Sequence, residues 1–252
     1  MKALVDGDIV CFRCATSMGE ETNLGILHFR INEMMDQILS KTEANSFMVF
    51  LTGQDNFRRK IYPEYKANRP QEKPQWWKEA REFLVSEFNA YIVDGQEADD
   101  ALAINQTTHT VICSIDKDLL QVPGKHFNFV KDEWYDIDYY EGLYRFYKQC
   151  LMGDRSDNIR GVAGIGDKKA DKILKECFTE TELFNAVRDT YGNDEEFLMN
   201  ARCLWIRRKE GDNYKYRFEK LAHEITISEE QREIVTELGE DQDTGQVSTT
   251  DS

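Results

Sequence analysis

The sequence predicts an α/β fold with a mainly parallel sheet flanked by helices, followed by a helical C-terminal part. Short apolar runs rich in β-branched and aromatic residues are typical of buried strands, and four of them occur at residues 2–5, 46–51, 90–93 and 110–114. Segments with helical spacing lie between these runs. Strands that alternate with helices indicate a parallel sheet, and such sheets bind ligands beyond the carboxyl ends of their strands.

In chain order, the first strand ends in acidic residues and leads into a loop. Residues 25–40 then form a helix whose apolar side chains fall on one face, and residues 76–88 form a second helix of the same kind after the second strand. A third helix begins at Asp99, before the fourth strand. Beyond residue 138 the pattern is helical, with helices expected at residues 138–152, 167–178, 180–191 and 196–206.

These patterns divide the chain into three parts. We expect an α/β part at residues 1–137 and a helical part at residues 138–227. Residues 228–252 carry eight acids and one arginine with few large apolar side chains, which predicts a largely disordered acidic tail.

The composition of the 252 residues excludes several classes of protein. With 40% apolar and 12% aromatic residues, the chain can build a core, so global disorder is excluded. It has no apolar run of about 18 residues and no secretory signal at its start, so we expect a cytoplasmic monomer away from membranes. Its six cysteines favour free thiols in a reducing compartment. Cys11 and Cys14 have metal-ligand spacing, but no second pair follows them.

The net charge of −15 at first argues against a nucleic-acid partner. The distribution of charge weakens that argument, because the acidic tail alone accounts for −7. Basic residues are concentrated at residues 58–69, 160–175 and 202–220. The acidic balance therefore indicates a carboxylate-rich site and a solubilising tail rather than a surface that repels nucleic acid.

Acidic residues follow three of the four predicted strands. Asp6 and Asp8 follow the first, the GQEADD segment at 95–100 follows the third, and the SIDKD segment at 114–118 follows the fourth. So many like charges at one edge would repel one another unless divalent cations neutralised them. Oxygen-only clusters suit Mg²⁺ or Mn²⁺. The alternative is that single acids such as Asp99 and Asp154 cap the next helix.

A second interpretation uses the same acids. DGDIV at residues 6–10 fits the DxDx[TV] pattern of haloacid-dehalogenase-like phosphatases, with Asp6 as nucleophile and Asp8 as acid/base. The GDRSD segment at 153–157 would then supply Mg²⁺ ligands, but it follows a helical segment rather than a strand. This interpretation also leaves the acids at 97–100 unexplained, so it is the weaker alternative.

A glycine-rich turn joins two helical segments of the C-terminal part. Three glycines allow close approach of the backbone, and three lysines follow on the next helix. An exposed helix N-terminus beside such a turn is suited to successive phosphates of a nucleic-acid strand. The residues expected to bind DNA here are Gly161, Gly164, Gly166, Lys168, Lys169 and Lys172.

Four segments together resemble the 5′-nuclease superfamily of flap endonucleases and 5′–3′ exonucleases, of the phage or bacterial polymerase-linked type. They are LVDGD (4–8), FRRKIYPEYKANR (57–69), GQEADD with SIDKDLLQV (95–122), and LMGDRSDNIRGVAGIGDKKADKIL (151–174). The resemblance implies a PIN-like domain with a basic arch at about 57–88 and a helix–turn–helix extension called H3TH. It implies a DNA hydrolase with two or three Mg²⁺ or Mn²⁺ ions, and often a K⁺ ion at the H3TH segment.

The resemblance also assigns residues to roles. The acids that match the first metal site are Asp6, Glu97, Asp99 and Asp100, and those that match the second are Asp116, Asp118, Asp154 and Asp157. Tyr65, Lys66 and Arg69 match the gateway for a 5′ single strand. We expect Lys66, Arg69 and Arg58 to steady the charge on the phosphate, and Tyr65 to stack on a base. The alternative for Tyr65 and for Trp76–Trp77 is ordinary helix packing.

One position departs from the family pattern. Many members have a metal-binding aspartate after the second strand, whereas Leu51 or Thr52 lies near that place here and the nearest acid is Asp55. This departure leaves open a junction-binding protein of the same fold with weak or no catalysis. The expected partners are DNA with 5′ single-strand/duplex junctions, RNA–DNA hybrids and replication proteins, in replication, repair or primer removal. The expected location is the cytoplasm, or the host cytoplasm if a phage encodes the chain.

Overall fold

The computed structural model describes residues 1–70 and 72–225, so the predicted tail at 228–252 lies outside the described residues. The chain forms two compact units, Met1–Asn213 and Tyr214–Ser252. The described part of the second unit is a helix over residues 214–225, in which the rings of Tyr214 and Phe218 meet edge to face. All of the residues predicted to form the functional site belong to the first unit.

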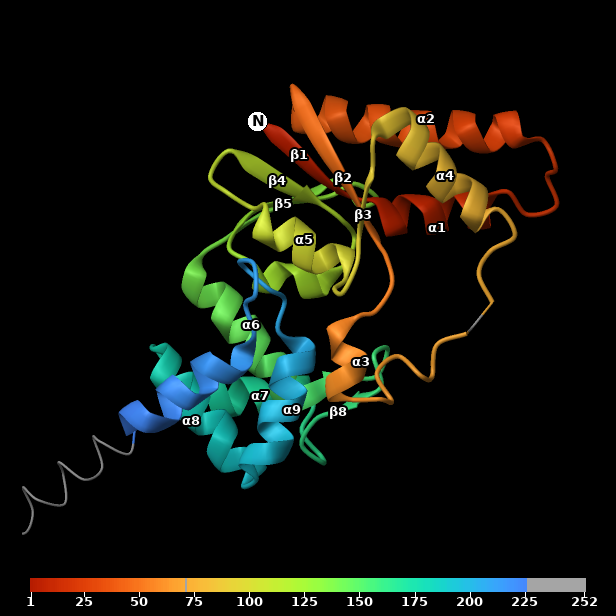
Figure 1. Cartoon of the computed structure of the whole chain (residues 1–252). Helices are drawn as coiled ribbons and strands as arrows, with labels where there is room; N and C mark the ends of the chain where they lie inside the picture. The colour runs from red at the N-terminus through yellow and green to blue at the C-terminus, as the bar shows by residue number, and fades with distance from the viewer. Residues whose placement is uncertain (71, 226–252) are drawn as a thin grey trace, which may run out of the picture. The chain divides into compact units, whose positions relative to one another are not determined.

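A six-stranded sheet forms the centre of the first unit, with the strand order β3-β2-β1-β4-β5-β6 (Figure 1). All neighbours are parallel except β5 and β6, which are antiparallel. The predicted mainly parallel sheet is confirmed. The strands are β1 (Lys2–Asp6), β2 (Ser46–Thr52), β3 (Tyr91–Val93), β4 (Thr110–Cys113), β5 (Gly124–Asn128) and β6 (Glu133–Ile137).

Helices cover both faces of the sheet because the strands are apolar on both sides. Along β1, Ala3 and Val5 pack into one buried cluster and Leu4 packs into another. The first cluster includes residues of α1 (Gly7–Ser17), α2 (Leu24–Thr42) and α4 (Trp77–Phe88). The second includes residues of α5 (Ala98–Ile104) and the 3₁₀ helix η1 (Lys117–Gln121).

The prediction of a loop after the first strand is wrong, because helix α1 begins directly at Gly7. The carboxylate of Asp6 caps this helix by accepting a hydrogen bond of 3.1 Å from the backbone N–H of Ile9. Gly7 is required at this turn, since a Cβ there would lie 2.7 Å from the carbonyl oxygen of Phe50. The close approach brings the start of α1 against the end of β2.

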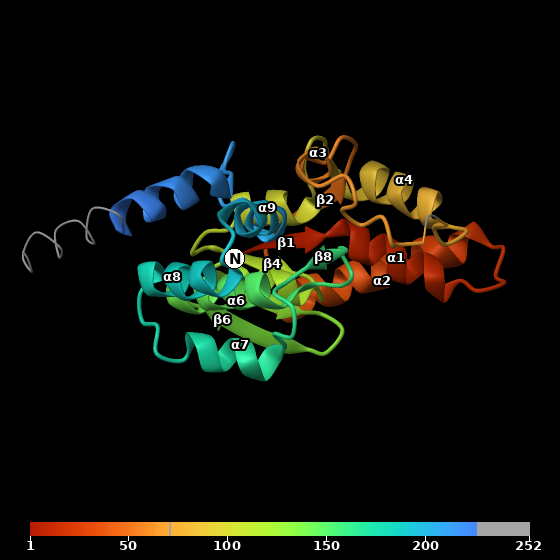
Figure 2. The same cartoon turned by 90° about the horizontal axis from the view of Figure 1, so that it is seen from below.

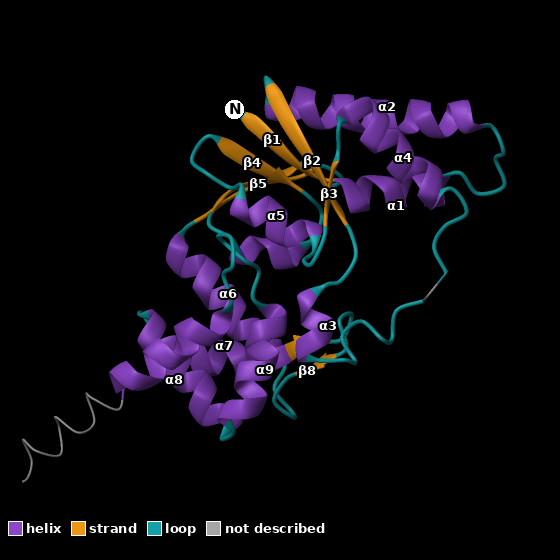
Figure 3. Cartoon of the chain, in the orientation of Figure 1, coloured by secondary structure: helices purple, strands orange, loops and turns teal. Residues whose placement is uncertain are grey.

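The second half of the unit is mostly helical (Figure 3). The predicted helices are present with shifted ends, since α7 ends at Leu174 and Asn193 caps α9 by accepting from two backbone N–H groups. Figure 2 shows α6, α7 and α8 gathered at one end of the unit, where α6 contacts both other helices. The elements are α6 (Tyr139–Met152), β7 (Gly153–Asp154), β8 (Ile159–Arg160), α7 (Asp167–Leu174), α8 (Glu180–Tyr191) and α9 (Asp194–Leu204).

The helical half packs against the sheet half within one compact unit. Gln121 of η1 joins the two halves, because its side chain donates to the carbonyl oxygen of Leu204 at 3.0 Å and accepts from the N–H of Ile206 at 3.1 Å. The boundary that we placed between residues 137 and 138 is therefore a change from strands to helices inside this unit. The end of α9 is thereby held next to the sheet.

The structure also bears on the cysteines and on membrane-spanning helices. All six cysteines are free thiols with buried side chains. Among the described residues, no helix has both the length and the apolar character needed to span a membrane.

The start of the glycine-rich turn crosses the end of α6 so closely that the two backbones leave no room for a side chain. A Cβ on Gly161 would lie 2.3 Å from the amide nitrogen of Gly153 and 2.4 Å from the carbonyl oxygen of Leu151. Both neighbours are backbone atoms, so neither can move aside as a flexible side chain would.

We therefore expect Gly161→Ala to lower the free energy of unfolding by about 1–3 kcal/mol, since overpacking a rigid site forces the backbone apart. The melting temperature should fall by roughly 2–4 °C per kcal/mol. The control is Gly166→Ala, because a Cβ at Gly166 would meet no described atom within 4 Å. Equal losses of stability in the two variants would contradict the tight packing inferred for this crossing.

Candidate functional site

Acidic side chains meet where β1 and β4 end and α5 begins. Asp6 is the last residue of β1, Asp99 lies in the first turn of α5, and Asp116 caps η1 just after β4. Burial, followed by the charges of Asp8 and Asp116, raises the pKa of Asp6 to about 7. Burial and then the charges of Asp6 and Asp116 raise the pKa of Asp99. The prediction that these strand ends bring carboxylates together is thus correct for this group.

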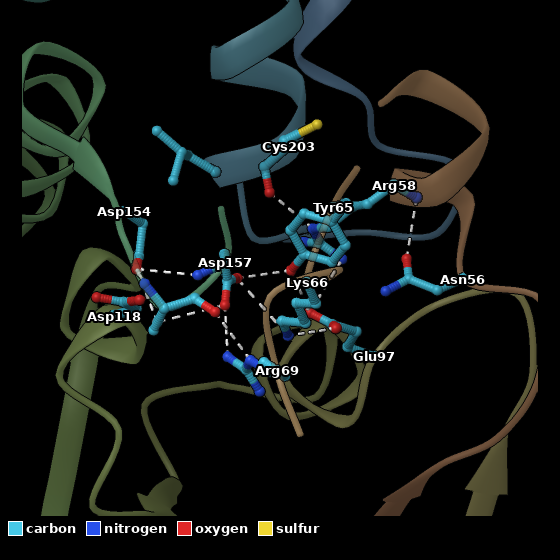
Figure 4. Close-up of polar contacts among 12 residues, drawn as sticks. Asn56, Arg58, Tyr65, Lys66, Arg69, Glu97, Asp118, Asp154, Asp157 and Cys203 are labelled. Atoms are coloured by element: carbon cyan, nitrogen blue, oxygen red, sulfur yellow. Dashed lines mark hydrogen bonds and ion pairs between the residues drawn. The ribbon is translucent and has the colours of Figure 1, made fainter. Parts of the chain in front are cut away.

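A second acidic group consists of Asp118 of η1 with Asp154 and Asp157 at the β7–β8 turn (Figure 4). Burial, with Asp116 and Asp154 next in effect, raises the pKa of Asp118 to about 8. Burial also raises the pKa of Asp154, but hydrogen bonds from Ser156 and the N–H of Asp157 lower it overall. The two groups share Asp116, whose pKa rises mainly through burial.

Basic and phenolic side chains from the segment after α3 (Phe57–Ile61) reach into the acids. Lys66 forms an ion pair with Glu97 and lies 3.6 Å from Asp157. Arg69 forms an ion pair with Asp157. The hydroxyl group of Tyr65 lies 3.0 Å from Glu97 and 2.8 Å from Asp157. This segment therefore supplies the positive charge that now faces Glu97 and Asp157 (Figure 4).

The chemistry of the donor set fits a hard divalent cation. In residues 1–70 and 72–225, no three Asp, Glu, His or Cys side chains converge as a ready-made metal site, because Lys66 and Arg69 lie among the acids. The acids with raised pKa are nonetheless buried (Asp6) or half-buried (Asp99, Asp116, Asp118) carboxylates. They offer oxygen ligands alone, which is the set that Mg²⁺ and Mn²⁺ prefer. Raised pKa values also indicate that additional positive charge would be stabilised at this place.

The structure corrects the expectation for Asp100 and Arg58, which bind each other instead of a metal ion and a phosphate. The guanidinium group makes two hydrogen bonds to the carboxylate, of 2.6 and 2.8 Å, and the side chains of Arg58 and Asp100 are 2% and 0% exposed. Arg58 also donates to the carbonyl oxygens of Cys203 and Trp205, at 2.8 and 2.9 Å. Asp100 further accepts from the backbone N–H groups of Glu97 and Arg207, both at 3.0 Å. The pair is thus a structural link between α3, α5 and the end of α9.

The expected stacking of Tyr65 on a base is also wrong for this arrangement, because the side chain is only 2% exposed. Trp76 and Trp77 likewise serve in packing, since Trp76 donates to the carbonyl oxygen of Glu21 and both rings pack against the core under α4. The alternative of ordinary packing therefore holds for Trp76 and Trp77, whereas Tyr65 lies in the turn after α3 with its hydroxyl group on Glu97 and Asp157.

Asp8 was expected at this edge of the sheet but not as a metal ligand, and Arg81 was not expected at the site at all. Arg81 of α4 donates to Asp8 at 2.6 Å and to the carbonyl oxygen of Thr52 at 2.8 Å, while Asp8 accepts from the N–H of Thr52 at 2.9 Å. Asp8, and not Asp55, is thus the acid at the end of β2, because it accepts from the N–H of Thr52, the last residue of that strand. Its charge also raises the pKa of Asp6. Asp55 is exposed and has no ion pair or side-chain hydrogen bond with a described residue. A basic residue on an amphipathic helix carries no sequence signal for such a role.

The glycine-rich turn begins beside β7 and presents its lysines to solvent. Gly164 has a positive φ of 75°, and its carbonyl oxygen accepts a 2.9 Å hydrogen bond from Lys169. Gly166 caps α7 without a side chain, which leaves the first N–H groups of the helix open. Lys168 and Lys172 are exposed. The predicted DNA-binding and K⁺-binding roles of this turn stay predictions.

Comparisons with known proteins cover most of the chain. Residues 2–148 match the family described as 5′-3′ exonuclease, N-terminal resolvase-like domain. The DNA polymerase I of Bacillus caldotenax is 30% identical over 242 residues, and the match covers 81% of this chain and 28% of that protein. The DNA polymerase I of Borreliella burgdorferi is 31% identical, covering 84% and 25%. The chain thus spans about a quarter of the length of these relatives.

The fold is also present in solved structures of a bacteriophage protein. The T5 D15 protein crystallised with metal ions has a TM-score of 0.66 and 22% identity, covering 81% of this chain and 89% of that chain. A complex of the T5 D15 flap endonuclease with DNA and metal ions has a TM-score of 0.65 with the same coverage. This likeness supports the α/β fold with its helical extension.

A substitution in the buried ion pair tests its structural role. Arg58→Met should lower the free energy of unfolding by about 3–5 kcal/mol, because it leaves the Asp100 carboxylate buried and unpaired. The double variant Arg58→Met/Asp100→Leu should recover much of that loss in chemical denaturation.

The control is the exposed ion pair of Lys41 and Asp132, whose side chains are 57% and 55% exposed. Lys41→Met should cost less than about 1 kcal/mol. If Arg58→Met were no more destabilising than Lys41→Met, the proposed structural role of the buried pair would be wrong.

Proposed function

The chain belongs to the 5′–3′ exonuclease family, and we propose that it is a metal-dependent 5′-nuclease that hydrolyses phosphodiester bonds near 5′ ends or flaps of DNA. The observation that carries the proposal is that buried and half-buried carboxylates with raised pKa values lie near one another, just beyond the carboxyl ends of β1 and β4 and at the start of α5. Such a cluster is costly to maintain in a fold, so it indicates a functional site. The haloacid-dehalogenase alternative is not retained, because Asp8 is held by Arg81 and Thr52.

The carboxylates would hold two divalent ions, Mg²⁺ or Mn²⁺. Asp6 and Asp99 are proposed as ligands of the first ion, with Glu97 nearby, and Asp118 and Asp154 as ligands of the second. Asp116 lies between the two groups. When bound, such ions activate the attacking water and stabilise the leaving oxygen.

Lys66 and Arg69 are proposed to neutralise the phosphate during hydrolysis. Their side chains already face Glu97 and Asp157 through ion pairs. Lys66 has a positive φ of 57° and its N–H donates to the carbonyl oxygen of Asp157 at 2.9 Å, so its backbone is fixed while its side chain can reorient. Bound cations would compete for the carboxylates and leave these two bases free to contact the phosphate.

The helical half would hold the duplex part of the substrate. The open N-terminus of α7 and the exposed lysines after the glycine-rich turn are suited to successive phosphates of one strand. A K⁺ ion at this turn is part of the proposal. The proposal further includes RNA–DNA hybrids as substrates, replication proteins as partners and a role in replication, repair or primer removal. It also includes a monomeric state and a cytoplasmic location.

One observation favours a second function, that of a junction-binding protein with weak catalysis. β2 ends in Thr52, whose hydroxyl group accepts from the N–H of Ala98 at 2.9 Å, instead of in a free carboxylate. Asp8 is present there but is paired with Arg81. Release of labelled products from a 5′-flap substrate in Mg²⁺ separates the two functions.

Asp116→Asn should abolish cleavage of a labelled 5′-flap DNA, by at least about 100-fold, because the two acidic groups share this carboxylate. Binding of the same DNA should be largely unchanged. Asp36→Asn, an exposed aspartate on α2, is the matched control and should retain full turnover. Wild-type turnover by Asp116→Asn in Mg²⁺ would exclude Asp116 from the metal site.

Lys168→Ala combined with Lys169→Ala should weaken binding of duplex DNA. The slope of log K against log salt should fall by about 0.9 for each phosphate that the variant no longer neutralises. Lys41→Ala removes one exposed positive charge far along the sequence and should leave the slope as it is. An unchanged slope in the double variant would remove this turn from the DNA interface.

A further inference from the structure

A second pocket lies between α3 and α9, which contact each other in the fold (Figure 1). Its volume is about 580 Å³, and its lining includes three basic side chains, Lys60, Arg202 and Arg207. None of its lining residues belongs to the set that surrounds the acidic site. The pocket is thus a separate feature, although Phe57 in its wall directly precedes Arg58 of the buried ion pair.

The positive charges of this pocket are not balanced by the acids around them. Neither Lys60 nor Arg202 forms an ion pair or a side-chain hydrogen bond with a residue in the described ranges. The guanidinium group of Arg207 forms one hydrogen bond, of 3.2 Å to Gln96, and no ion pair with a described residue. Glu195 lines the pocket, but it lies beyond ion-pair distance of all three bases. In a chain with a net charge of −15, three such bases around one cavity indicate that an anion binds there.

Buried donors point to the same conclusion. The Nε atoms of Arg202 and Arg207 are both inaccessible to solvent and have no hydrogen-bond partner in the described part of the chain. An unsatisfied buried donor costs about 1–3 kcal/mol, and more when it is charged, so the arrangement is unfavourable as it stands. The cost is lowered when an anion faces the same guanidinium groups through their terminal nitrogens, and phosphate is suited to arginine.

The remaining wall of the pocket is apolar. Phe57, Leu198 and Met199 form it, and the guanidinium group of Arg207 lies 3.8 Å from the centre of the Phe57 ring. A purely inorganic anion would make no use of this surface. A nucleotide would, because its phosphate can contact the bases while its sugar or nucleobase packs against the apolar side chains.

We propose that the pocket between α3 and α9 binds one nucleotide unit of a single-stranded nucleic acid, with its phosphate at Lys60, Arg202 and Arg207. The proposal rests on the proposed function for the identity of the ligand as a nucleic-acid strand. α3 leads directly into the segment that carries Lys66 and Arg69. A strand held in the pocket would therefore be tethered close to the acidic site without occupying it.

The test measures binding without cleavage. Fluorescence anisotropy of a labelled oligothymidylate is recorded with the full chain in EDTA. Arg202→Ala should weaken binding about tenfold, as expected when one charge-assisted hydrogen bond is removed. Lys60→Ala/Arg202→Ala should lower the salt slope by up to about 0.7, since the pocket holds one phosphate and each neutralised phosphate of a single strand adds about 0.7 to the slope. Arg202→Lys, which keeps the charge, should recover part of the affinity and guards against misfolding of the alanine variant.

Arg13→Ala is the matched control, because Arg13 is an exposed base of α1 that has no ion pair with a described residue. It should bind as the wild type does. Competition with thymidine monophosphate separates the two sources of the phosphate: displacement of the oligonucleotide shows that free nucleotides use the pocket, and no displacement shows that it requires a strand. Wild-type affinity and salt slope in Lys60→Ala/Arg202→Ala would overturn the proposal. Failure of the proposed nuclease function would give a different result from failure of the pocket proposal. In that case the wild type would bind DNA but would not cut flaps in Mg²⁺.

Discussion

The buried pair of Arg58 and Asp100 is the constraint on which the site depends. Its two hydrogen bonds of 2.6 and 2.8 Å join α3 to α5, and its further bonds to the carbonyl oxygens of Cys203 and Trp205 hold the end of α9 in the same place. Asp100 also accepts from the N–H of Glu97 and so fixes the start of α5. One arginine thereby connects three segments that are far apart in the sequence. All three border the acidic site, and α3 and α9 also border the pocket between them.

Charge balance explains how a fold can hold so many carboxylates at one edge. Some are neutralised by bases that the chain supplies: Arg81 pairs with Asp8, and Lys66 pairs with Glu97. Others form no ion pair within the described residues, and their pKa values rise through burial and mutual repulsion, as for Asp6 and Asp118. A divalent cation is therefore stabilised most by these unpaired acids, while the paired acids keep the surrounding backbone in position.

The sequence predicts the fold well where local pattern and tertiary structure agree. The four apolar runs become β1 to β4. Both faces are buried along β1 and β4, whereas β3 at the edge of the sheet is largely exposed. The acids that follow them converge because parallel strands end at the same edge. The sequence pattern does not predict strands β5 and β6, since they mix charged and aromatic residues in five-residue stretches. The partnership of Arg58 with Asp100 could not be predicted, because 42 residues separate them and nothing local distinguishes a buried base from a substrate-binding one.

The central claim is that the buried acids without a basic partner in the described chain form a site for divalent cations. Calorimetric titration of the full chain with Mg²⁺ at pH 7, repeated in buffers of different ionisation enthalpy, tests it most directly. Since the pKa of Asp6 is raised to about 7 and that of Asp118 to about 8, the metal-free protein holds protons that a cation must displace. The charge balance at the site predicts saturable binding whose heat varies with the buffer, with proton release that declines above pH 8. Absence of binding, or binding with no proton released at pH 7, would contradict it.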